Sequence, residues 1–304
     1  MLRRDFLKAT AVAPVLAQLL WREAMAGRIS PEEHRERAAK FDAEALAVFP
    51  FERVQVSGKT ALQEWERLKR GEQRAPIVIG GDRELKALAA QFHPGNWTIL
   101  PEPNLAETLA RADELTHPQS LLAHWRKEEE QVKQFLAADP GRRGVVDAFI
   151  ERLKEIGFRT DRTAGPPIGR WPIRPPAPTE LSVVWNRETD SPFDVVNIVL
   201  VPTDDWTEIP AYMRWGNWNQ NPPAEYHVAA LRSWRDRYGA ELVGLSFDVI
   251  NIRVADKPET REEAMALARE QYGYCNDIVD QGVGTLSELA ASLKAHDWWY
   301  FWWD

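Results

Sequence analysis

The chain has 304 residues, 44% of them hydrophobic and 28% charged, which suits one large or two medium globular domains. Its formal net charge of −8 argues against nucleic-acid binding, which requires a basic face, and gives no attraction to anionic lipid. Cys275 is the single cysteine, so an intrachain disulfide is excluded.

Residues 1–26 have the features of an export signal. The run RRDFLK at 3–8 resembles the twin-arginine signal pattern R-R-x-F-L-K. The apolar stretch 9–20 is too short to span a bilayer, and residues 24–26 offer a small-x-small cleavage site. The resemblance implies export of the folded protein to the periplasm or another extracytoplasmic compartment, with no stable membrane span in the mature chain. The alternative, favoured by Glu23 in the cleavage region, is an amphipathic N-terminal helix.

Residues 27–165 form a second predicted region, rich in helices. Ser30 is followed by Pro31 and Glu33, a pattern that favours a capped helix reaching about Val48. Strands and helices then alternate, which predicts a mixed or parallel sheet segment. The predicted elements are strand 51–58, helix 60–69, strand 75–81, a helix capped by Asp82, and mainly helix over 105–157.

Six prolines crowd the stretch 166–180, and proline lacks the amide proton that helices and sheets require. We therefore predict a linker or an extended strap over the surface. This stretch is the best boundary between residues 27–165 and a C-terminal domain at 181–304. If residues 27–165 instead share one sheet with the C-terminal domain, the boundary does not separate two units.

Residues 181–304 combine buried-strand patterns with capped helices, so the predicted class is α+β: a mixed sheet with helices packed on it. Thr260 with Glu263, and Thr285 with Glu288, have the spacing of capping boxes. The predicted elements are strand 193–202, helix 223–238, strands 240–246 and 248–254, helices after 260 and 285, and a C-terminal strand.

The C-terminal strand is the most unusual element, because the chain ends in HDWWYFWWD. Alternate side chains of a strand point to opposite faces, so its aromatic residues divide into two sets. The sets are Trp298, Tyr300 and Trp302 on one face, and Trp299, Phe301 and Trp303 on the other. Aromatic residues on both faces predict a core strand covered on both sides, whose burial contributes on the order of 10 kcal/mol before entropy is subtracted.

A set of motifs in the last third of the chain recurs in one bacterial family. The motifs are Gly-x-Trp-Asn at 216–219, Asn-Pro at 221–222, a tryptophan within a helix, Tyr-Gly-Ala-Glu at 238–241 before a strand with Asp248, and the terminal WWYFWWD. With them, residues of about 195–304 resemble the family called domain of unknown function 4253. The resemblance implies no established activity, cofactor or catalytic residue. A twin-arginine start is not typical of this family.

The stretch Trp215–Pro222 is the best candidate ligand site, because amides between tryptophans suit a polar ligand. The candidate binding residues are Trp215, Asn217, Trp218, Asn219 and Asn221. The alternative, which we favour, is a tight turn in which asparagines bond their own backbone and Asn221 caps the following helix.

Asp248, with Glu270 or Glu225, is the candidate pair for acid–base catalysis. Asp248 is expected at the margin of an apolar strand face, where burial would raise its pKa unless a cation offsets it. Arg214, Arg235 or Arg253 could supply that cation. A structural salt bridge is therefore favoured over a catalytic role.

Metal and cofactor motifs are scarce in this sequence. The histidines have no metal-ligand spacing, and His117 with His124 is interpreted as a surface pair rather than a metal site. Cys275 is interpreted as a packed thiol, because a nucleophilic cysteine needs a nearby base. No cofactor is predicted.

These residues favour an exported protein whose C-terminal domain binds a small molecule or a protein and is not an enzyme. One alternative is an extracytoplasmic hydrolase of a sugar or peptide, which needs two carboxyl groups about 5 to 10 Å apart across a cleft. Another is an immunity-type protein that binds a toxin through Trp215 and Trp218.

Overall fold

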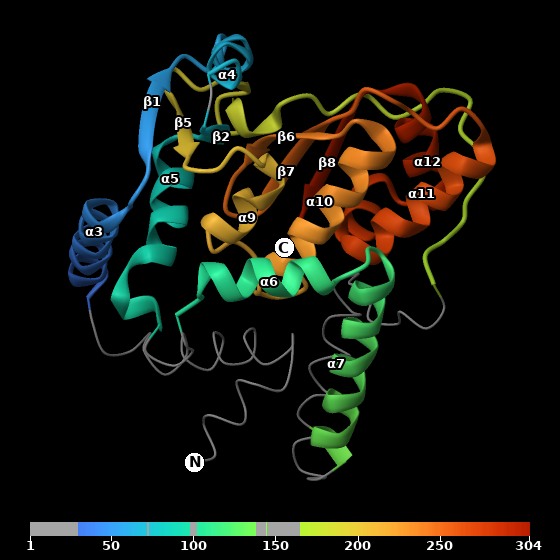
Figure 1. The fold of residues 1–304 in the computed structure, drawn as a ribbon, viewed down its shortest axis with the longest axis horizontal. Helices are drawn as coiled ribbons and strands as arrows, with labels where there is room; N and C mark the ends of the chain where they lie inside the picture. The colour runs from blue at the N-terminus through green and yellow to red at the C-terminus, as the bar shows by residue number, and fades with distance from the viewer. Residues whose placement is uncertain (1–29, 72, 98–101, 138–143, 145–164) are drawn as a thin grey trace.

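The computed structural model describes residues 30–71, 73–97, 102–137, 144 and 165–304 (Figure 1). The export-signal pattern and most of the predicted helical stretch after residue 137 lie outside these residues.

The described part of the N-terminal region contains five α-helices and two strands, close to the predicted ranges. Ser30 caps the first helix by accepting a hydrogen bond from the backbone of Glu33, as its sequence predicts. Asp82 is the first residue of its helix and Gly81 the N-cap, so the predicted cap is one residue off. The elements are α3 (Pro31–Val48), β1 (Glu52–Val56), α4 (Ala61–Lys69), β2 (Ala75–Gly80), α5 (Asp82–Ala89), α6 (Leu105–Glu114) and α7 (Gln119–Ala137), with 3-10 turns η1 (Ala90–Phe92) and η2 (Pro94–Trp97).

The described region after residue 180 contains the predicted strands and helices and six short additions. Thr260 and Glu263 form the complete capping box of α11, and Thr285 caps α12. The main elements are β5 (Val196–Val201), α10 (Ala224–Tyr238), β6 (Glu241–Leu245), β7 (Val249–Arg253), α11 (Arg261–Tyr274), α12 (Leu286–Ala295) and β8 (Trp298–Trp302). The smaller ones are η3 (Ser182–Val184), β3 (Trp185–Asn186), β4 (Ser191–Pro192), η4 (Trp206–Glu208), α9 (Ile209–Tyr212) and the π-helical η5 (Ile278–Val283).

Strands from both sides of the proline-rich stretch join one sheet of six strands, in the order β1-β5-β2-β6-β7-β8. The β5 strand pairs antiparallel with β1 and β2, and β2 pairs parallel with β6. The β6, β7 and β8 strands then pair antiparallel. The sheet is therefore mixed, and the α+β class with helices packed on the sheet is confirmed.

The two faces of this sheet carry two hydrophobic clusters. The helical face packs against α5, α10, α11 and α12, whereas the second face packs against α4 and η3 (Figure 1). Alternate residues of one strand serve the two faces: Ile77 and Ile79 belong to the helical face, and Val78 between them belongs to the second face. This alternation decides which side chains can meet in a site.

The proline-rich stretch forms an extended strap that docks on α12. The backbone carbonyls of Pro167 and Ile168 accept hydrogen bonds from the amides of Leu286 and Ser287, at 2.9 Å each. Trp171 lies under the guanidinium of Arg261, 4.3 Å from the ring centre. Of the two predicted forms, linker or strap, these contacts agree with a strap over the helices of the helical face.

The Trp-rich strand β8 lies at an edge of the sheet within an aromatic cluster. Its helical face is almost fully buried, and the Phe301 ring stacks on Trp234 with centroids 5.3 Å apart. Its second face is only half buried, because the hairpin β3–β4 supplies part of the cover there, including Arg187, which donates to the Tyr300 hydroxyl. The strand is therefore covered on both faces, as predicted, but less completely on the second face.

No helix among the described residues is both long and apolar enough to cross a membrane.

Candidate functional site

The loop between α9 and α10 bends sharply at four of its residues, Arg214, Gly216, Asn217 and Asn219, which have φ values of +53°, +99°, +64° and +48°. Asparagine tolerates this left-handed region better than most residues, and glycine occupies it without strain. A Cβ atom on Gly216 would lie 2.1 Å from the carbonyl oxygen of Pro222, so only glycine fits there. The tight turn expected from the sequence is therefore present.

Two predicted binding residues of this loop, Trp215 and Asn221, are buried. Each is 2% exposed. The Trp215 indole donates a 2.7 Å hydrogen bond to the Ser246 carbonyl, and its ring lies against His227. The Asn221 side chain contacts His227 and does not cap α10, whose N-cap is Pro223. Trp215 therefore cannot contribute to a surface that binds a toxin, and the capping role expected for Asn221 is wrong.

A buried hydrogen-bonded chain runs from Asn221 through His227 to Tyr274, linking the loop to α10 and α11. The Oδ1 atom of Asn221 lies 2.7 Å from Nε2 of His227, and the Tyr274 hydroxyl lies 2.6 Å from Nδ1. Because Oδ1 only accepts, Nε2 carries the proton and the tyrosine donates to Nδ1. Burial, with a smaller contribution from His117, lowers the pKa of His227 to about 3. The chain is therefore neutral and stabilises the loop.

A second tryptophan of the loop, the half-buried Trp218, stacks on the half-buried Phe247 of the turn between β6 and β7. The Trp218 ring lies parallel to that of Phe247, with centroids 4.8 Å apart and planes 12° apart. Asn217 beside it is exposed, and the Asn219 amide donates a 2.9 Å hydrogen bond to the Asp304 carbonyl. Of the five predicted binding residues, Trp218 and Asn217 are thus the ones placed to meet a ligand. We call Trp218 and Phe247 the aromatic platform.

Glu270 on α11 is held in a second polar cluster of the helical face. Its Oε1 accepts a 2.7 Å hydrogen bond from the Trp234 indole, and Arg237 binds both oxygens at 2.9 Å. The Nε2 atom of His117 lies 3.2 Å from Oε1. Burial would raise the pKa of Glu270, but the contacts with His117, Arg237 and Trp234 outweigh it and lower the pKa to about 2. Glu270 therefore remains ionised and suits a structural role better than that of a general acid.

The comparisons with known proteins concern the part of the chain that holds these groups. Residues 197–304 match the model of a family described as a domain of unknown function, DUF4253. The resemblance inferred from the sequence is confirmed for this segment. No curated protein and no solved structure matches the chain. Trp218, His227 and Glu270 lie within the DUF4253 segment, whereas His117 lies outside it.

The other two candidate carboxylates of the DUF4253 segment lie apart from Glu270. Asp248, in the turn before β7, accepts hydrogen bonds from the Ser246 hydroxyl at 3.0 Å and the Trp302 indole at 3.2 Å. Since Trp302 belongs to the second face, Asp248 and Glu270 contact opposite faces of the sheet. Glu225 instead pairs with Arg111 at 3.2 Å. The geometry therefore does not place two of these carboxyl groups across one cleft.

The expected arginine partners of Asp248 pair with other carboxylates among the described residues. Their partners are Glu102 for Arg214, Asp205 for Arg235, and Glu66 and Glu241 for Arg253. The expected salt bridge of Asp248 is thus replaced by neutral donors, because its side chain leans towards Trp302 rather than into a charged cluster.

The histidine and cysteine interpretations have different outcomes. His117 and His124 are not a surface pair, because the His117 side chain is 1% exposed. Cys275 is buried, and its thiol donates to the Trp302 carbonyl at 3.0 Å. Burial raises the pKa of Cys275 far above its usual value, which suits a packed thiol. Among the described residues, no three His, Cys, Asp or Glu side chains gather as a metal site would require.

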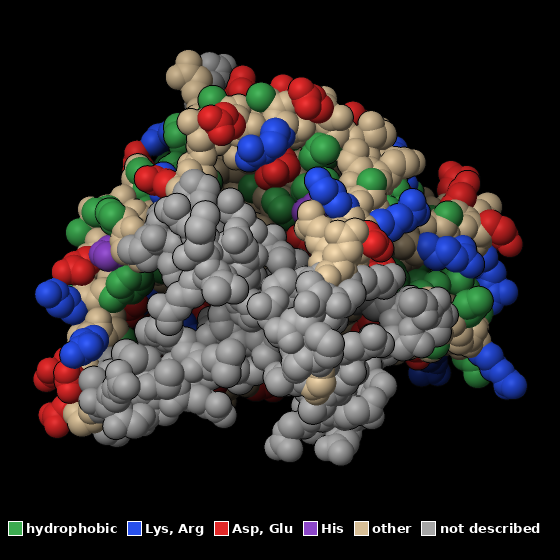
Figure 2. Space-filling model, turned by 90° about the horizontal axis from the view of Figure 1, so that it is seen from below, with side chains coloured by type: hydrophobic (Ala, Val, Ile, Leu, Met, Phe, Trp, Pro, Cys, Tyr) green, Lys and Arg blue, Asp and Glu red, His purple; other side chains and the backbone are tan. Residues whose placement is uncertain are grey.

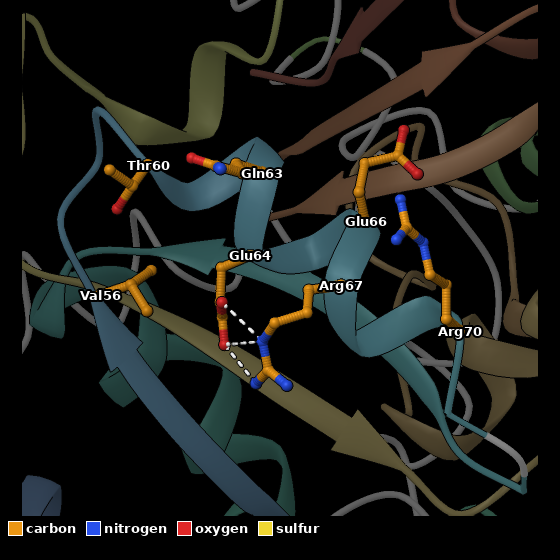
Figure 3. A pocket seen from close by; sticks show the side chains of 7 residues that line it. All are labelled: Val56, Thr60, Gln63, Glu64, Glu66, Arg67 and Arg70. Carbon is orange, nitrogen blue, oxygen red and sulfur yellow. Dashed lines mark hydrogen bonds and ion pairs between the residues drawn. The ribbon is translucent and has the colours of Figure 1, made fainter.

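A surface hollow of about 490 Å³ lies elsewhere, against α4 (Figure 3). Its walls include Arg67, whose guanidinium binds Glu64 along the same helix. None of the residues predicted from the sequence lines it. On the described part of the face shown in Figure 2, acidic and basic side chains are interspersed.

Several residues of the buried clusters were not found by sequence reasoning. The buried chain of His227 and Tyr274 was not predicted, because each residue occupies an ordinary helical core position. His117 was assigned to a surface pair because it lies seven residues before His124 on a predicted helical stretch, where the two could share a face. The available signal for the buried chain was Gly216, because a glycine in this turn allows the backbone to approach His227 closely.

Proposed function

We propose that this chain is an exported, non-enzymatic binding protein that recognises a polar ligand with a flat apolar face, such as a sugar, at the aromatic platform. The observation that carries the proposal is the parallel stack of Trp218 on Phe247 beside the exposed amide of Asn217. An indole held in this way offers a stacking surface, and an amide both donates and accepts hydrogen bonds. This combination suits a ring that carries hydroxyl groups.

The environment of the carboxylates supports binding over hydrolysis. Glu270 is ionised and engaged by Trp234 and Arg237, while Asp248 contacts the opposite face of the sheet. A glycosidase needs one carboxylic acid with a raised pKa and a second carboxylate facing it. These two carboxylates are therefore better suited to packing than to hydrolysis.

The binding test compares two tryptophans of the same chain. Wild-type protein is titrated against a panel of soluble oligosaccharides by calorimetry, and the best ligand is then measured with Trp218→Ala. We expect about tenfold weaker binding, since a lost aromatic stack costs about 1 kcal/mol or more.

Trp185→Ala is the matched control, because Trp185 is 43% exposed on the hairpin β3–β4. It should bind like wild type. Equal affinity of both variants would exclude the aromatic platform as the site.

Export by the twin-arginine route is the second part of the proposal, supported by the run RRDFLK at 3–8. In cells that possess this pathway, replacing Arg3 and Arg4 by lysine should retain the protein in the cytoplasm. Arg22→Lys should leave export unchanged. Fractionation followed by N-terminal sequencing measures both, and an intact Met1 on cytoplasmic wild-type protein would contradict export.

A further inference from the structure

A pocket in the DUF4253 segment is filled by a side chain from outside that segment. The walls are Trp234 on α10, and Glu270 and Tyr274 on α11. The ring of His117, between α6 and α7, makes T-shaped contacts with Trp234 and Tyr274, with centroids 5.1 Å and 6.1 Å apart and planes at 80° and 87°. Its side chain is 1% exposed. The imidazole is therefore enclosed by groups of the C-terminal segment.

The walls of this pocket are fixed by contacts that do not involve His117. Arg237 and the Trp234 indole hold the Glu270 carboxylate, and the Tyr274 hydroxyl bonds to His227. Trp234 also stacks on Phe301 of β8. A site whose walls are held by their own partners is organised before its ligand arrives.

His117 itself is poorly satisfied. Its Nε2 lies 3.2 Å from Glu270 Oε1, yet neither ring nitrogen makes a hydrogen bond of good geometry. A buried polar atom without a partner lowers the stability of the fold by about 1 to 3 kcal/mol. The ring is therefore held by the shape of the pocket and by the nearby carboxylate, and not by a good hydrogen bond. An imidazole with freer placement could approach the same carboxylate oxygen better.

We propose that the pocket formed by Trp234, Glu270 and Tyr274 is a binding site for an imidazole group, and that His117 is its intrachain ligand. The carboxylate oxygen of Glu270, 3.2 Å from Nε2 of His117, is the acceptor for the N–H of a better-placed imidazole, and the two aromatic rings set the width for a flat five-membered ring. The segment α6–α7 (residues 105–137) is then docked on the DUF4253 segment through this ring. Ion pairs of Asp113 with Arg232 and of Arg111 with Glu225 surround the contact. The proposal does not depend on the aromatic platform.

The test removes the ligand and returns it in solution. Full-length His117→Ala is heated with and without free imidazole, and with thiophene, which has a similar ring but no N–H donor. Imidazole should raise the Tm saturably by about 2 to 4 °C, and thiophene by clearly less. In His117→Ala combined with Glu270→Gln, the preference for imidazole should disappear.

His124→Ala is the control, because His124 lies seven residues further along the same segment, within α7, and its Nε2 is 3.6 Å from the part-buried Glu128 instead of Glu270. Equal stabilisation by thiophene and imidazole would show a mere cavity and overturn the proposal. The proposal would also be overturned if imidazole raised the Tm of His117→Ala no more than it raised the Tm of His124→Ala.

A second pair of variants decides the question if His117→Ala does not fold. His117→Gln keeps an N–H donor, and His117→Met has a similar length without one. The proposal expects a Tm for the glutamine variant several degrees above that of the methionine variant. An equal or higher Tm for His117→Met would overturn it, because packing alone would then account for the ring.

Discussion

The two faces of strand β8 carry similar aromatic side chains but have different surroundings. On the helical face, Trp299, Phe301 and Trp303 are at most 1% exposed and pack on Trp234 and Tyr274. On the second face, the residues between them are half buried and hydrogen-bond with polar neighbours. These contacts join Trp302 to Asp248 and Tyr300 to Arg187. The same residue types thus form a core on one face and an amphipathic surface on the other, because cover comes from neighbouring elements.

Removing strand β8 should have the largest effect, because the domain should no longer fold. Deletion of residues 298–304 removes both aromatic sets and exposes the helical face of β7. We expect loss of cooperative unfolding, because burial of such side chains contributes on the order of 10 kcal/mol before entropy is subtracted. Circular dichroism during heating measures the transition. A folded, soluble truncation with a sharp transition would refute the core role of β8.

Single substitutions should separate the two faces. Phe301→Ala on the helical face should lower the free energy of unfolding by about 3 to 5 kcal/mol, the usual effect of truncating a buried phenylalanine. Tyr300→Ala, its neighbour on the second face, should cost clearly less, since that side chain is already part exposed. Chemical denaturation of both variants gives the comparison. Equal losses would mean that the second face is as well packed as the first.

The polar chain under the helical face should make stability depend on pH. The pKa of His227 falls from 6.5 to about 3 on folding, so the unfolded chain binds more protons between these values. Stability is therefore full above pH 6.5 and decreases as the pH falls towards 3, by about 2 kcal/mol at pH 5.

Glu270 adds a loss mainly below pH 4.5, because its pKa falls from 4.5 in the unfolded chain to about 2 on folding. The window from pH 6.5 to 4.5 thus reports on histidine. His227→Gln should show a flatter profile there in urea titrations at several pH values. An unchanged slope would show that His227 is not the group responsible.

The sequence predicted the helices and strands better than it predicted which strands lie next to one another in the sheet. Capping boxes at Thr260 and strand patterns such as PIVIG depend on adjacent residues, and these gave ranges close to the observed ones. The order of strands depends on which edges meet in space, which periodicity does not encode. The insertion of β2 between β5 and β6 was therefore left open.

The sequence predicted which residues belong to the candidate site better than it predicted how they are arranged in space. The loop at Trp215–Pro222 was found, but its sorting into buried and exposed residues depends on Gly216 closing over His227. Glu270 on α11 and His117 in the connection between α6 and α7 are far apart in the chain, so no local signal joins them. Asp248 received arginine partners by charge alone, whereas the fold supplies an indole and a hydroxyl.

The position of β2 has a consequence for any fragment of this protein. In the part of the chain that the structure describes, the complete sheet has two free edges, the outer sides of β1 and β8. The DUF4253 segment alone would retain β5 by itself and the group β6-β7-β8, which together expose four edges. Unpaired edges are templates for pairing with other chains. A fragment made from the matched residues alone should therefore form intermolecular aggregates. In the whole chain, β2 prevents this, because it pairs with β5 on one side and with β6 on the other and so joins the two parts of the segment in one sheet.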